Sequence, residues 1–89
     1  MKAILTVIGK DRIGIIAAVS NILAESNINI LDISQTIMQG FFTMIMLVDI
    51  SQMSLSFSEI SEELDRKGRE LGLSIRLHHE DIFNAMLRL

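Results

Sequence analysis

The sequence predicts an α+β domain in the order strand, helix, strand, strand, helix, strand. Two stretches repeat apolar residues at helical spacing, whereas four others are short, apolar and rich in isoleucine, leucine or valine. Polar or glycine-containing segments separate these stretches from one another. A chain of 89 residues suits one domain, and the balance of 49% apolar against 21% charged residues excludes intrinsic disorder.

The first strand and the first helix flank a polar loop. Residues 2–8 are a short apolar run typical of a strand, and the segment 9–14, which reads Gly-Lys-Asp-Arg-Ile-Gly, ends it. We expect the helix to begin between Asp11 and Gly14 and to end by Asn27. Its apolar stripe consists of Ile15, Ile16, Val19, Ile22 and Leu23.

A hairpin of two strands is predicted next, over residues 28–38 and 41–50. In the first of these strands the apolar residues change parity after Ile30, so we expect either a β-bulge or burial on both faces. Gly40 supplies a positive φ for a tight turn. The second strand is apolar on both faces, which predicts a central strand with both faces covered.

The second helix carries strong local signals at both ends. Ser56 and Glu59 form a capping-box pattern at its start, and Gly72 suits its C-terminal cap. Apolar and polar residues then alternate from Leu73, as in a strand with one solvent-facing side. Asp81 is placed to cap a final short helix.

This order of elements is the ferredoxin-like βαββαβ plan. It puts two helices on one face of a four-stranded antiparallel sheet, in a two-layer α+β sandwich, with the short C-terminal helix in addition. We therefore expect one domain over residues 1–79. Residues 80–89 are expected to form a helical tail that packs on the same domain or on a partner.

Composition argues against several classes of function. The net charge is −3 and the chain has no tryptophan or tyrosine, so a basic surface and a base-stacking platform for nucleic acid are both missing. No apolar run approaches 18 residues, which argues against a membrane span. The absence of cysteine removes thiol nucleophiles and cysteine-ligated metals, and it favours the cytoplasm over secretion.

The residues give little support to a catalytic or metal site. No nucleophile stands beside an oriented base in the pattern, so we predict no catalytic residue and no enzyme activity. His78 and His79 are adjacent on a predicted strand and point to opposite faces, so they do not easily share a metal ion. We expect them to be polar residues at a strand end, with no metal and no cofactor.

The loop 9–14 is the best candidate for a binding site. It leads into the N-terminus of the first helix, where free backbone N–H groups and the helix dipole favour a carboxylate or a phosphate. Gly9 and Gly14 allow the backbone to approach a ligand closely. The alternative is an ordinary helix start that Asp11 caps, with the glycines only shaping the turn.

Two segments resemble the ACT domain, a small ligand-sensing module with the same βαββαβ order. They are residues 9–15, Gly-Lys-Asp-Arg-Ile-Gly-Ile, and residues 24–30, Ala-Glu-Ser-Asn-Ile-Asn-Ile. Ile13 stands where the family usually has proline, which only pre-sets φ at the first helical position. The resemblance covers residues 2–79. The segment from His79 to Met86 is similar to a family of stand-alone bacterial ACT proteins, and the first half is similar to glycine cleavage system repressor-like ACT proteins.

The resemblance implies that an amino acid binds at a homodimer interface, between the first loop and the start of the second strand. It places the ligand site at Asp11, Arg12, Ile13, Gly14, Ile15 and Asn29. A ligand carboxylate would suit the helix N–H groups and Arg12, and a ligand ammonium would suit Asp11 or the Asn29 side-chain oxygen. The function implied is a non-enzymatic regulatory module, a homodimer or higher homo-oligomer, which controls another protein in trans.

Three other functions remain open at this point. A protein-interaction or assembly module would form the same dimer with no small-molecule ligand. An RNA-binding domain of this fold would need exposed strand aromatics, and only Phe41 and Phe42 lie near a strand. A small phosphate-binding hydrolase would have to rely on Arg12 and Asn29.

Overall fold

The computed structural model describes residues 1–81 and confirms the predicted order of elements. The described chain runs β1 (Lys2–Lys10), α1 (Ile15–Glu25), β2 (Asn29–Met38), β3 (Phe41–Asp49), α2 (Phe57–Leu71) and β4 (Leu73–His79). The final helix predicted after Asp81 lies outside the described residues. No helix within residues 1–81 has the length and hydropathy needed to cross a bilayer.

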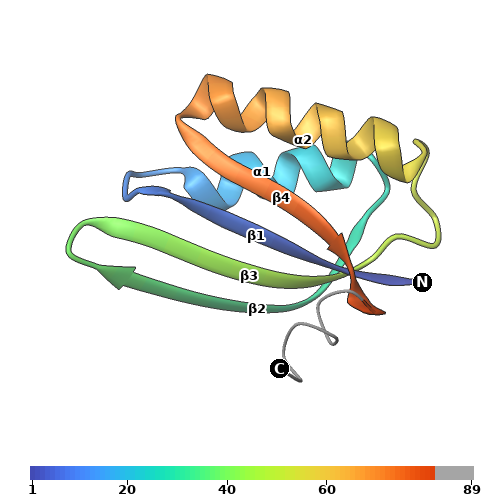
Figure 1. Cartoon of the computed structure of the whole chain (residues 1–89), viewed down its shortest axis with the longest axis horizontal. Coiled ribbons are helices and arrows are strands. Elements are labelled where there is room, and N and C mark those ends of the chain that lie inside the picture. The colour runs from blue at the N-terminus through green and yellow to red at the C-terminus, as the bar shows by residue number, and fades with distance from the viewer. Residues whose placement is uncertain (82–89) are drawn as a thin grey trace.

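The four strands form one antiparallel sheet in the order β2-β3-β1-β4. Both helices lie on the same side of this sheet, as Figure 1 shows. The strands β2 and β4 are therefore the two edges, and β1 and β3 are central. This is the ferredoxin-like plan that the sequence predicts.

The core lies between the helices and one face of the sheet. Alternate residues of β1, namely Ala3, Leu5 and Val7, are fully buried there. They share that face with the buried side of β3, because cross-strand partners in an antiparallel pair point the same way. The rest of the core comes from β3, β4, the helices and two residues that flank strands: Phe42, Met44, Met46, Val48, Leu73, Ile75, Leu77, Ile15, Val19, Ile22, Leu23, Ile60, Leu64, Ile28 and Ile50.

The hairpin β2–β3 confirms one of the two explanations for the change of parity. The pairing register shifts between Ile30 and Asp32, which marks a bulge at Leu31. Gln39 and Gly40 both have positive φ, at 52° and 81°, as a tight hairpin turn with the twist of its strands requires.

The prediction that both faces of β3 are covered is wrong for this chain. The strand is central, but only its helix-facing side is buried. On its other side Phe41 and Ile45 remain exposed, because the two helices occupy a single face. The apolar residues on both faces of β3 therefore do not mean that both faces are buried within one copy.

The two helices begin in different ways. The Ser56 hydroxyl accepts from the Glu59 amide, and the Glu59 carboxylate accepts from the Ser56 amide, so the predicted capping box of α2 is confirmed. The N-cap of α1 is instead Gly14, at φ 92°, and no described side chain caps this end. The alternative in which Asp11 caps α1 is therefore wrong.

Candidate functional site

An open groove lies between the N-terminus of α1 and the hairpin end of β2 and β3. Its volume is about 520 Å³. Four of the predicted site residues line it: Asp11, Arg12, Gly14 and Ile15. The rest of the wall comes from Ile16, Ala17, Gln35, Ile37 and Phe42.

The start of α1 presents unpaired backbone donors to this groove. The first amide of the helix that finds an intrahelical acceptor is that of Ala18, which donates to the Gly14 carbonyl over 2.9 Å. The amides of the first turn have no carbonyl one turn earlier to accept from them. The first turn also carries no acidic side chain. The helix dipole and these amides together favour an anionic group in the groove.

Asp11 ties the loop to the turn of the hairpin. Its backbone amide donates to the Gly40 carbonyl over 2.8 Å. This bond holds the loop before α1 against the turn between β2 and β3. The Asp11 side chain is thereby left at the rim of the groove with Arg12. Ile13, the adjacent loop residue, is fully exposed and does not line the groove.

Asn29 lies at the opposite end of the sheet from the loop. It starts β2 and pairs with Asp49, whereas the loop follows Lys10, which pairs with Phe41 at the other end of β3. Nine residue steps along β2 correspond to about 30 Å. One copy of the chain therefore does not bring Asn29 together with Asp11 and Arg12.

The sequence did not predict five of the groove residues, two of which, Ile16 and Ala17, follow the predicted loop on α1. Gln35, Ile37 and Phe42 enter the groove because the hairpin folds back beside the loop, which is a long-range contact. Gln35 breaks the run of isoleucines on the helix-facing side of β2, between Ile33 and Ile37. A polar residue at an apolar strand position is the signal that points to it.

The corner around Asn29 holds a second polar group of contacts. The Asp49 carboxylate accepts from the Ser51 hydroxyl over 2.6 Å and from the Ser51 amide over 2.9 Å. The Met1 ammonium donates to the Ser51 hydroxyl and lies 3.6 Å from Asp49. The two Ser51 bonds, followed by the ammonium, hold the pKa of Asp49 below its ordinary value.

The two histidines are separated by the sheet. His79 stacks on Phe57 of α2, with ring centroids 4.0 Å apart, on the helix side. His78 is the cross-strand partner of Ile4 on the other side. Residues 1–81 contain no cluster of three or more histidine, cysteine or acidic side chains that would hold a metal.

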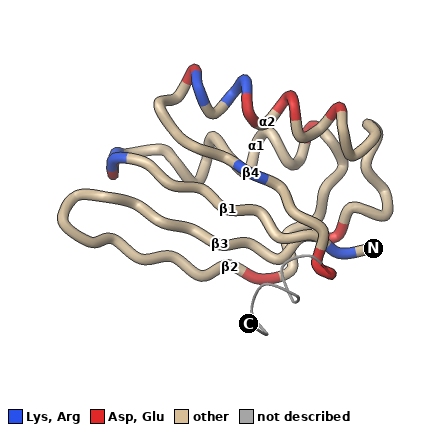
Figure 2. Tube along the Cα trace, in the orientation of Figure 1, with Lys and Arg blue, Asp and Glu red and all other residues tan. Residues whose placement is uncertain are grey.

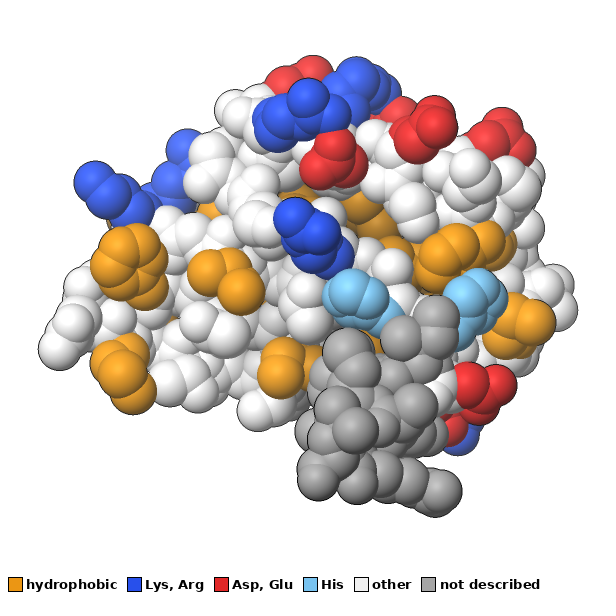
Figure 3. Space-filling view, in the orientation of Figure 1, with side chains coloured by type: hydrophobic (Ala, Val, Ile, Leu, Met, Phe, Trp, Pro, Cys, Tyr) orange, Lys and Arg blue, Asp and Glu red, His pale blue; other side chains and the backbone are white. Residues whose placement is uncertain are grey.

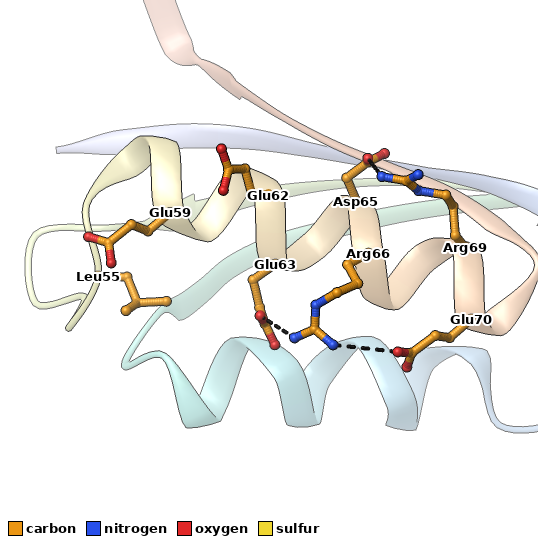
Figure 4. Close-up of a pocket in the computed structure, with 8 residues that line it drawn as sticks. All are labelled: Leu55, Glu59, Glu62, Glu63, Asp65, Arg66, Arg69 and Glu70. Carbon is orange, nitrogen blue, oxygen red and sulfur yellow. Dashed lines mark hydrogen bonds and ion pairs between the residues drawn. The ribbon is translucent and has the colours of Figure 1, made fainter.

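A hollow larger than this groove lies away from the predicted site. It runs along α2 and is lined mostly by charged residues, which Figure 4 draws. Arg66 pairs there with Glu63 and Glu70, and Arg69 pairs with Asp65. The contact with Glu63 raises the pKa of Arg66. These pairs span one helical turn, so they stabilise an exposed helix face, and Figure 2 shows this charge along α2.

The fold and the glycine-flanked loop before α1 define a class of regulatory modules that bind small ligands. The chain belongs to the ACT domain family, whose model matches residues 2–78. It is similar to the UPF0237 protein of Clostridium acetobutylicum, with 64% identity over 89 residues and all of both chains covered.

Two solved structures share the fold. The ACT domain protein from Streptococcus pneumoniae superposes with a TM-score of 0.82, at 42% identity, over 93% of each chain. A putative glycine cleavage system transcriptional repressor superposes with a TM-score of 0.74, at 24% identity, over 85% of this chain and 43% of its own. The second likeness bears on the fold alone.

Proposed function

We propose that the chain is a non-enzymatic regulatory module that binds an amino acid at the interface of a homodimer. The observation that carries this proposal is the groove at the start of α1, which combines free backbone donors, Arg12 and an apolar wall. A pocket with an apolar lining and a few convergent polar groups is typical of small-molecule sites.

The separation of Asn29 from the loop supports a site made by two copies. β2 is an edge strand, and antiparallel pairing with β2 of a second copy about its middle would reverse its direction. Asn29 of the partner subunit would then lie beside Met38, next to the hairpin turn and the groove. The Asp11–Gly40 hydrogen bond holds the loop at this same turn. The two halves of the predicted site thus meet only across a two-fold axis.

The exposure of β2 supports this pairing. Nearly all of its ten residues are exposed, including Ile33 at 42% and Ile37 at 55%. The strand contains no proline or lysine, and the features that protect an edge from pairing are confined to Asp32 and the bulge at Leu31. Ile16 of α1 is exposed on the same side of the sheet. A second copy at this edge would bury all three isoleucines.

The groove would contact three groups of an amino-acid ligand. A carboxylate would accept from the first-turn amides and from Arg12. An apolar side chain would contact Ile37 and Phe42. An ammonium would be held by Asp11 and by the side-chain oxygen of Asn29 of the partner subunit. The absence of cysteine supports action in the cytoplasm, and the module would control another protein in trans.

Isothermal titration with the twenty amino acids tests the proposal. We expect heat from at least one of them, with apolar side chains preferred. Asn29→Ala should weaken that binding about tenfold through the loss of one hydrogen bond, and Arg12→Ala should weaken it by at least as much. Asn21→Ala, an exposed change on α1 outside the groove, is the matched control and should bind normally.

Three outcomes would overturn parts of the proposal. No heat at millimolar ligand would favour the other open function, an assembly module that forms the same dimer with an empty groove. Normal binding by Asn29→Ala would move the site away from the two-copy arrangement. A monomer detected by light scattering at the titration concentration would also contradict the two-copy arrangement.

A further inference from the structure

The side of the sheet that faces away from both helices carries an ordered pattern. We call this side the open face, because neither helix of the described chain covers it (Figure 1). The strand pairing places its residues in rows that run from β2 through β3 and β1 to β4. The rows are Asp32, Leu47, Ile4 and His78; then Ser34, Ile45, Thr6 and Arg76; then Thr36, Thr43, Ile8 and Ser74.

Charge and hydropathy on the open face change from one edge to the other. Asp32 on β2 marks the acidic edge, and Arg76 on β4 marks the basic edge, as the red and blue segments of these strands show in Figure 2. The two central strands carry the apolar residues. Ile8, Ile45 and Phe41 are 49%, 39% and 54% exposed, whereas Ile4, in the row of Asp32, is already buried at 7% exposure within one copy. Apolar side chains also gather at the hairpin end of the surface in Figure 3.

We propose that the open face pairs with the open face of a second copy, about a two-fold axis parallel to the strands. The axis would run along the midline of the sheet, between β3 and β1. This contact is separate from the pairing of β2 edges and does not depend on a ligand. Such a rotation lays β2 of one copy over β4 of the other, and β3 over β1.

Under this rotation, the residues of one open face meet residues of complementary charge and size on the other. Asp32 would lie beside His78 and Arg76 of the partner subunit, so the acidic edge meets the basic edge twice. Ile8 of the partner subunit would lie over Thr43. Thr43 is the small residue between Phe41 and Ile45, so the larger side chain enters a gap between two others, as in packed sheets.

Another two-fold axis is less favourable. An axis in the sheet plane but perpendicular to the strands would lay β4 over β4. It would bring two Arg76 side chains near each other, and it would leave Asp32 without a cation. The charges therefore favour the axis parallel to the strands.

The open face is large enough for a reversible contact. Four strands about 4.8 Å apart and three rows about 6.8 Å apart give about 390 Å² of flat face, or about 800 Å² for two copies. That area is below the usual range for specific association, so we expect a weak equilibrium that shifts with concentration.

Sedimentation velocity on the full chain over a range of concentrations tests the proposal. Ile8→Glu should halve the mass of the assembled species, because it places a charge at the centre of the apolar strip. Circular dichroism should show an unchanged fold. If the glutamate variant does not fold, Ile8→Thr takes its place in the experiment. This milder change at the same exposed position should weaken association about tenfold.

A charge exchange provides the sharper measurement. Asp32→Lys and Arg76→Glu should each weaken association about tenfold, because each creates two like-charge contacts in the symmetric pair. The double variant should recover most of the loss. Glu62→Lys, the same kind of reversal on an exposed position of α2, should associate like the unchanged chain.

Three results would overturn the proposal. The first is an unchanged mass for Ile8→Glu, which would mean that another occupant, residues 82–89 included, covers the open face. The second is a double charge variant no better than the single ones. The third is equal weakening by Glu62→Lys, which would show a general effect of charge. None of these results bears on amino-acid binding at the groove.

Discussion

Asp49 makes several contacts at the end of the sheet where Asn29 lies. Its carboxylate accepts two hydrogen bonds from Ser51 and lies near the Met1 ammonium. It is also the cross-strand partner of Asn29. These contacts hold the end of β3 and so fix the start of β2, where the predicted ligand residue lies.

The lowered pKa of Asp49 predicts a pH dependence of stability. Because folding lowers this pKa, the contribution is present above the unfolded-state pKa of about 4 and is lost as the pH falls through the lower folded value. Asp49→Asn should therefore lower the melting temperature at pH 7. The difference from the unchanged chain should shrink steadily as the pH is lowered below 4.

Thermal melts at pH 7 and at successively lower pH provide the measurement. Asp65→Asn is the control, since its carboxylate pairs with Arg69 on the exposed face of α2. A difference between Asp49→Asn and the unchanged chain that stays constant with pH would contradict the assignment to the ionised carboxylate.

At the scale of elements, the sequence predicts what local contacts determine. The start of α2 depends on Ser56 and Glu59, which are three residues apart, so the pattern is visible in the sequence. The N-cap of α1 is instead Gly14 at φ 92°, and Asp11 donates its backbone amide to Gly40, which is 29 residues later in the chain. The sequence pattern does not reveal a contact between segments so far apart.

The same distinction applies to the candidate site. Asp11, Arg12, Gly14 and Ile15 were predictable because they form one contiguous motif. Gln35 and Phe42 join them only through the fold of the hairpin. The resemblance implied a role for Asn29, but only the strand register shows that a single copy leaves it at the wrong end of the sheet.

The packing of α2 on β4 predicts a helix position where alanine is less stabilising than glycine. A Cβ atom at Gly68 would lie 2.8 Å from the backbone oxygen of Leu73. Alanine favours helices by about 1 kcal/mol over glycine, but here the helix would have to move off the strand. We expect Gly68→Ala to lower the free energy of unfolding by about 1–3 kcal/mol.

Urea denaturation measures this loss. Ser58→Ala, an alanine at an exposed position of the same helix, is the control and should change stability by less than about 0.5 kcal/mol. A stabilised Gly68→Ala variant would show that α2 can shift and that the close approach is not required.

At the scale of the whole molecule, the described chain has two separate apolar surfaces. One is the β2 edge on the helix side, and the other is the open face. The chain is small and 49% apolar, and its two-layer fold places both helices on one side of the sheet. Each surface would be covered by a second copy under its own two-fold axis, one through the β2 edge and the other along the midline of the sheet.

A ligand bound between two copies should strengthen their association. If two copies complete the site as proposed, only the assembled form binds fully, and a ligand at 100 times its Kd would stabilise assembly by about 2.7 kcal/mol per site. In sedimentation runs on diluted chain, saturating amino acid should lower the concentration at which edge pairing is half complete. Ile33→Glu should remove that response, whereas Ile8→Glu should keep it.

A response that survives in Ile33→Glu would contradict the link between the ligand and the β2 edge. A response absent from every variant, with binding still detected by titration, would place the whole site within one copy.

The hydrogen bond between Asp11 and Gly40 also bears on protein engineering. Hairpin turns are ordinarily good places to insert a foreign sequence, because little else depends on them. Here the turn carries the acceptor that holds the loop before α1, and both of its central residues have positive φ. An inserted reporter at Gln39 and Gly40 would therefore act on the groove directly. The hairpin turn is therefore a poor place for an inert tag, and it would suit a biosensor if the groove binds the proposed ligand.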